Sequence, residues 1–102
     1  MVQYVNSNTI PGQYFTVAAS QTTQALGNVG AKGDYLEAFM IIPATATPGV
    51  VTVFDGTTAI FSVPALTSIA PVRIEVRAFS KTGSWNITTG ASVSVVAVGL
   101  FT

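Results

Sequence analysis

Glycine and proline interrupt this sequence about every ten residues, and no stretch between them sustains the 3.6-residue period of an amphipathic helix. Turn residues at that spacing are typical of sandwiches and barrels built from short antiparallel strands. The most regular segment is residues 72–79, in which apolar and charged side chains alternate. A period of two predicts a strand with one buried face. The chain is therefore expected to be all-β.

Several further segments have the composition of strands. Residues 50–54 and 58–63 are β-branched and aromatic runs on either side of Asp55-Gly56, a dipeptide typical of hairpin turns. The remaining strand candidates are residues 14–19, 35–42, 84–89 and 92–101. The helix formers at the start of residues 35–42 leave a helix as the less favoured alternative there. Seven or eight antiparallel strands fit a jelly-roll-like β-sandwich or, alternatively, an immunoglobulin-like sandwich.

The length of 102 residues corresponds to one domain. Its first 13 residues are polar and contain Asn6-Ser7-Asn8 and Pro11-Gly12. We expect residues 1–13 to form an extended N-terminal arm that becomes ordered against a neighbour. Residues 14–102 are expected to form a single β-sandwich domain.

Charge is scarce in this chain. Only 8% of the residues are charged, against about 25% in an ordinary soluble domain, while 49% are apolar and the net charge is zero. A small neutral protein with an apolar surplus is expected to cover that surplus by self-association or on a larger particle. A net charge of zero gives no attraction to nucleic acid or to an anionic membrane. The longest uncharged segments are also too polar or too short to form a membrane-spanning helix.

The inventory of reactive side chains argues against an enzyme. The sequence has no histidine and no cysteine, which removes the commonest general base and the commonest zinc ligands. Asp34 and Glu37 would point to opposite faces of a strand, or cap a helix, instead of forming a catalytic pair. Asp55 is interpreted as a turn residue. We expect no catalytic site, no metal and no cofactor.

Two strands carry the candidate contact residues. Arg73, Glu75 and Arg77 form a charged stripe on one face of residues 72–79, which is either solvated or complementary to a stripe on a neighbouring subunit. Residues 95–98 are apolar on both faces of their strand, a pattern typical of a strand covered on both sides. Residues 35–42 are a further candidate contact strand. The candidate interface residues are Arg73, Glu75, Arg77, Val96, Val98 and Leu100.

Exposed aromatic side chains would indicate a different function. Five aromatics on or near strands could build a carbohydrate-binding platform, although core packing is the more frequent explanation: Tyr14, Tyr35, Phe54, Phe61 and Trp85. The alternative function is therefore a receptor- or glycan-binding module. It predicts that Trp85 is needed for binding and not for assembly.

Three segments resemble small all-β virion proteins that tailed bacteriophages encode among their head genes: GDYLE at residues 33–37, VFDG at residues 53–56 and SKTGSWNITTGASVSV at residues 80–95. The resemblance extends over residues 33–101 and leaves the arm outside. It implies a capsid decoration, or cement, protein that is made in the host cytoplasm and sits on the capsid surface as a homotrimer. Its partners would be further copies of itself and the major capsid protein. Such proteins act through surfaces, so the resemblance assigns no individual site residues. For the alternative function, the resemblance implies a binding module of a phage head or tail fibre.

Overall fold

Eight strands and no helix make up the part of the chain that the computed structural model describes, residues 12–102 except 65, 66 and 68. The strands are β2 (Gln13–Val17), β3 (Gln24–Ala25), β4 (Tyr35–Pro43), β5 (Val51–Asp55), β6 (Thr58–Val63), β7 (Val72–Phe79), β8 (Trp85–Thr89) and β9 (Val93–Leu100). Most of the predicted arm, residues 1–11, lies outside the described residues. Strand β2 begins at Gln13, one residue before the predicted start of the sandwich.

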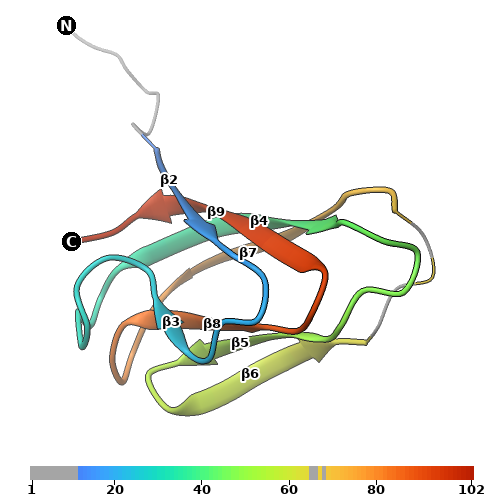
Figure 1. Ribbon diagram of the computed structural model, residues 1–102. Helices are drawn as coiled ribbons and strands as arrows, with labels where there is room; N and C mark the ends of the chain where they lie inside the picture. The colour runs from blue at the N-terminus through green and yellow to red at the C-terminus, as the bar shows by residue number, and fades with distance from the viewer. Residues whose placement is uncertain (1–11, 65–66, 68) are drawn as a thin grey trace, which may run out of the picture.

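The strands form two antiparallel sheets that pack face to face (Figure 1), with the orders β2-β9-β4-β7 and β3-β8-β5-β6. The prediction of an all-β sandwich is confirmed. Residues 35–42 lie in strand β4 and not in a helix. No helix among the described residues is long and apolar enough to cross a membrane.

The pairing of the strands distinguishes the two predicted topologies. The first strand pairs with the last, β2 with β9, and the successive inner pairs are β3 with β8, β4 with β7, and β5 with β6. These nested pairs fall alternately in the two sheets, which is the arrangement of the eight-stranded jelly roll. An immunoglobulin-like sandwich pairs its first two strands in one sheet, whereas β2 and β3 lie in different sheets. The jelly-roll prediction is therefore the correct one.

The core lies between the two sheets, where every second side chain of β5, β8 and β9 is buried. In β4 the alternation is broken at the bulge, so that Ala38 and Phe39 are both buried. The rings of Phe39 and Phe61 meet across it with their centroids 5.7 Å apart. Burial of this apolar area supplies the main stabilising force of the domain. The buried cluster consists of Val17, Leu26, Leu36, Phe39, Ile41, Val51, Val53, Trp85, Ile87, Val93, Val95 and Ala97.

The hairpin that Asp55-Gly56 predicts is present between β5 and β6. Gly56 has a φ of 63°, in the left-handed region that glycine enters without a steric penalty. The loop that precedes β4 contains a strand that the sequence did not reveal, because β3 has only two residues and pairs with β8. Strand β3 completes the second sheet at one edge.

Candidate interaction face

All six predicted interface residues project from the same side of one sheet. In β7 and β9 the burial alternates, so that one set of side chains enters the core and the other set points outward. Arg73, Glu75 and Arg77 are the outward side chains of β7, and Val96, Val98 and Leu100 are those of β9. Strand β4 lies between the two. We call the outward side of the sheet β2-β9-β4-β7 the outer face.

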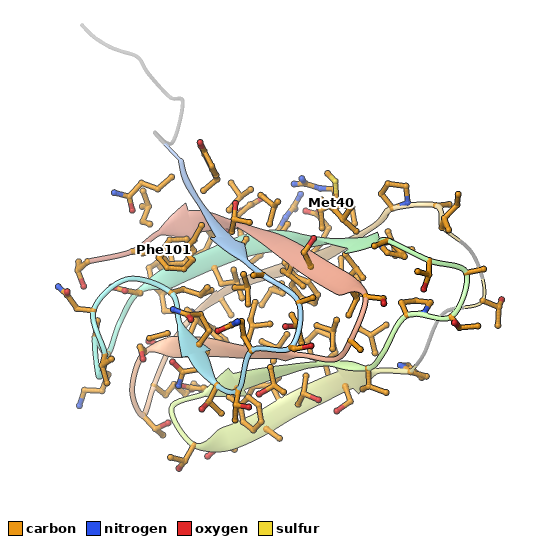
Figure 2. The ribbon with its side chains drawn as sticks, viewed as in Figure 1. Met40 and Phe101 are labelled. Atoms are coloured by element: carbon orange, nitrogen blue, oxygen red, sulfur yellow. The ribbon has the colours of Figure 1, made fainter. Side chains whose placement is uncertain are left out.

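The register of the sheet divides the outer face into two strips. Val96 lies opposite Met40, which in turn lies opposite Arg73. Val98 lies opposite Tyr14 on the other side. Figure 2 shows Met40 projecting away from the second sheet. The apolar strip consists of Tyr14, Met40, Val96, Val98 and Leu100, and the charged strip consists of Glu37, Arg73, Glu75 and Arg77.

Three large apolar side chains of the apolar strip are exposed to solvent. The exposed fractions are 76% for Tyr14, 36% for Met40 and 38% for Leu100. Scattered exposed apolar side chains are ordinary on a protein surface, but contiguous ones mark contact sites. Here the strand pairing makes them contiguous.

The charged strip is a connected network with two cations and two anions. The Nε of Arg73 lies 2.6 Å from Oε2 of Glu75, and the Nε of Arg77 lies 3.1 Å from Oε1 of Glu75 and 3.3 Å from Oε2 of Glu37. The hydrogen bond from Arg73 is the main reason that the pKa of Glu75 lies below its ordinary value of 4.5. Because these side chains are substantially exposed, the network contributes little to folding stability, which leaves it available for contacts.

A bulge brings Glu37 into this network. The register of β4 with both of its neighbours shifts between Leu36 and Ala38. On the facing strand, Arg77 has a φ of 54°, in the left-handed region that costs a side-chain-bearing residue about 1–2 kcal/mol. Bulges commonly redirect a side chain. This one directs Arg77 toward Glu37, a contact that the period-two alternation of residues 72–79 could not reveal.

An aromatic pair closes one end of the outer face. The rings of Tyr35 and Phe79 lie 5.0 Å apart, and the Tyr35 hydroxyl donates a hydrogen bond of 2.5 Å to Oε1 of Glu37. That hydrogen bond is the leading cause of the raised pKa of Tyr35. A hollow of about 300 Å³ adjoins the pair, lined by Gly12, Tyr35, Glu37, Val98 and Gly99. Phe79, which is 66% exposed, was not among the predicted site residues.

The other predicted candidates lie elsewhere. Asp34 is buried and accepts hydrogen bonds from the backbone N–H (3.0 Å) and the hydroxyl (2.9 Å) of Thr102, so it does not meet Glu37. Trp85 is 3% exposed, and Phe61 packs against the core. Two of the five aromatic candidates are therefore core residues, and Trp85 cannot contact a glycan in the folded protein.

The outward side of the second sheet has a different chemistry. Thr52 lies opposite Ser62 on one neighbouring strand and Thr88 on the other, and the Thr52 and Ser62 hydroxyl oxygens are 2.9 Å apart. Phe54 lies opposite Asn86. This side is thus lined mainly by hydroxyl and amide groups and lacks an ion-pair network among the described residues.

Comparison with known proteins adds no further assignment. No protein-family model, no curated protein and no solved structure matches the chain. Among the described residues no three acidic side chains gather as a metal-binding group would require. The geometry of the outer face is therefore the basis on which function is inferred.

Proposed function

We propose that this chain is a structural virion protein that decorates and stabilises a bacteriophage capsid, and that the outer face is the surface that meets the capsid. The observation that carries this proposal is the segregation of surface chemistry between the two sheets. One outward side holds a contiguous apolar strip beside four of the eight charged residues of the chain. The other is lined mainly by uncharged polar groups.

The division of the outer face suits a docking surface. Burial of apolar side chains supplies affinity at about 25 cal/mol per Å². Charged groups supply orientation and partner choice more than affinity. Many copies bound to one lattice add their weak contacts through avidity. A decoration protein needs no strong single site, and the jelly roll is a fold that capsid proteins use, which is support by analogy only.

Charges introduced into the apolar strip should weaken docking through the outer face. Tyr14→Asp combined with Met40→Asp is expected to weaken binding to undecorated heads of the phage that carries the gene by at least about tenfold, because each buried apolar side chain contributes about 1.5–3 kcal/mol. Both side chains are exposed, so the fold should tolerate the change. Cosedimentation of purified protein with the heads measures the binding.

Ile60→Asp is the matched control, because Ile60 is 48% exposed and belongs to β6 of the second sheet. It should bind heads as the unaltered protein does. Equal loss in both variants would contradict the assignment of the outer face. A wild-type protein that stays monomeric and does not bind the heads would overturn the capsid proposal itself.

One observation favours a second candidate, a glycan-binding module. The exposed Phe79 ring, the Tyr35 hydroxyl and the Glu37 carboxylate lie together at one end of the outer face. An aromatic ring beside polar acceptors is suited to a sugar. In that case Phe79→Ala should abolish binding on a glycan array and leave binding to heads intact. Phe54→Ala, on the other sheet, is its control. Loss of head binding alone would contradict the glycan-binding candidate.

A further inference from the structure

Strand β7 forms a free edge of the first sheet. It pairs with β4 on one side, and no strand among the described residues pairs with its other side. With eight residues it is longer than the other three edge strands, β2, β3 and β6. The part of this edge before the bulge at Arg77 exposes a row of backbone N–H and C=O groups that can pair with another strand.

The core beside this edge is incompletely covered. Val72, Ile74 and Val76 point inward from β7 but are only partly buried. The corresponding inward side chains of the central strand β9, among them Val93 and Val95, have exposed fractions of 0–1%. An added strand along β7 would remove part of this remaining apolar surface from water.

We propose that a second copy of the chain pairs antiparallel with this edge along residues 72–76, about a two-fold axis at Ile74. In that register Ile74 lies opposite Ile74 of the second copy, and Val72 lies opposite the second copy's Val76. These are β-branched pairs of the kind that stabilise antiparallel sheets.

The charged strip is complementary to itself in the same register. Arg73 lies opposite Glu75 of the second copy and Glu75 lies opposite the second copy's Arg73, which places two pairs of opposite charge on the outer face. A register centred on Glu75 would instead place Glu75 opposite itself and Arg73 opposite Arg77, which is repulsive. Among the described residues, Arg73 makes its ion pair with Glu75 through Nε. The other nitrogens of the Arg73 guanidinium can therefore donate to the second copy.

The backbone limits the pairing to the same five residues. Pro71 has no N–H to donate at one end. At the other end, Arg77 with its φ of 54° interrupts the extended strand. The regular part of the edge is thus residues 72–76, and its midpoint is Ile74. A two-fold axis at this same residue places Arg73 opposite Glu75 of the second copy.

Such pairing would join two four-stranded sheets into one of eight strands and double the area of the outer face. It also predicts an even number of subunits, in contrast to the trimer that the resemblance implies. The inference concerns the purified protein alone and does not depend on what particle the outer face meets. Its test therefore uses no capsids, and its failure would leave the capsid proposal untouched.

A charge exchange between the two positions tests the register. Arg73→Glu alone and Glu75→Arg alone each place like charges opposite each other, so each variant should shift from the mass of two chains to that of one. An equal mixture of the two variants restores both attractive pairs and should return to the mass of two chains. Light scattering during size-exclusion chromatography measures the mass, and circular dichroism checks the fold of each variant.

Arg77→Glu is the matched control, because it makes the same change of charge outside the paired segment and should stay dimeric. A wild-type protein that is monomeric at its highest soluble concentration, or trimeric, would overturn the proposal. So would a dimer that both single variants retain, or a mixture that stays monomeric.

Discussion

Replacing Trp85 by alanine is expected to lower the free energy of unfolding by about 3–5 kcal/mol, the cost of removing a large aromatic side chain from a close-packed core. Trp85 is 3% exposed, and its Nε1 donates a buried hydrogen bond of 3.0 Å to the carbonyl oxygen of Asp34. Domains of this size have total stabilities of about 5–15 kcal/mol. The variant should therefore be partly unfolded at moderate temperature. Urea denaturation measures the change. It is followed by circular dichroism, because the substitution removes the single tryptophan that fluorescence would report on.

Two variants separate packing from hydrogen bonding in this experiment. Trp85→Phe retains most of the ring contacts and removes one of two hydrogen bonds to the Asp34 carbonyl, which still accepts one of 2.9 Å from the Ser80 N–H. It should therefore cost about 0.5–1.5 kcal/mol. Phe54→Ala removes a half-buried ring from the outward side of the second sheet and should cost less than Trp85→Ala. A Trp85→Ala protein within about 1 kcal/mol of the wild type would contradict the core assignment. Loss of ligand binding in this variant would report unfolding and could not identify a glycan site.

The strands whose signal is local could be predicted from the sequence. The alternation of residues 72–79 coincides with β7, and Asp55-Gly56 lies between β5 and β6 as expected. Both signals arise within a few neighbouring residues, from side-chain period in one case and turn geometry in the other. The same alternation correctly placed Arg73, Glu75 and Arg77 on one side of their strand.

Features that depend on distant partners could not be predicted. Strand β3 is too short to have a period, and it is held by contacts with β8, among them the hydrogen bond of 2.8 Å from the Leu26 N–H to the Trp85 carbonyl. The outward side chains of β7 and β9 share one face because both strands pair with β4 in the same sheet. That arrangement follows from the topology and not from any local sequence pattern. The sequence suggests Glu37 only as a candidate partner of Asp34, and it does not single out Phe79. Their places on the outer face could not be predicted, because a bulge and a strand end determine their surroundings.

Asp55 shows how a local interpretation can be incomplete. The sequence predicts a turn residue whose side chain forms hydrogen bonds with the backbone of its own turn. Asp55 does end β5 just before the hairpin turn. Its carboxylate, however, accepts hydrogen bonds from the backbone N–H groups of Lys81 (2.9 Å) and Thr82 (3.1 Å) and from the Thr82 hydroxyl (3.2 Å). One side chain thus ties the β5–β6 hairpin to the loop between β7 and β8.

Asp55→Ala is expected to lower the free energy of unfolding by about 2–3 kcal/mol. Hydrogen bonds to a charged acceptor each contribute about 1.5–3 kcal/mol, and water can replace part of this loss because Lys81 and Thr82 are exposed. Urea denaturation at neutral pH measures the effect. Thr57→Ala, at an exposed position of the same hairpin, is the control and should change stability by less than about 0.5 kcal/mol.

The contribution of Asp55 should also depend on pH, in a direction that its surroundings determine. Burial alone would raise the pKa of this carboxyl, but the hydrogen bonds from Lys81, Thr82 and Gly83 outweigh burial and hold the pKa below its ordinary value of 3.8. The folded protein therefore binds the proton less readily than the unfolded chain. The stabilisation is complete above the unfolded pKa and is lost as the pH falls through the folded one.

Asp55→Asn isolates this dependence, because an amide cannot ionise. The difference in unfolding free energy between wild type and Asp55→Asn should be constant above about pH 5 and should shrink as the pH falls below 3.8. Glu75, whose pKa is also lowered, is present in both proteins, so its titration cancels in the difference. A difference that stays constant down to the pH at which both proteins unfold would mean that the ionised carboxylate does not hold the two loops together.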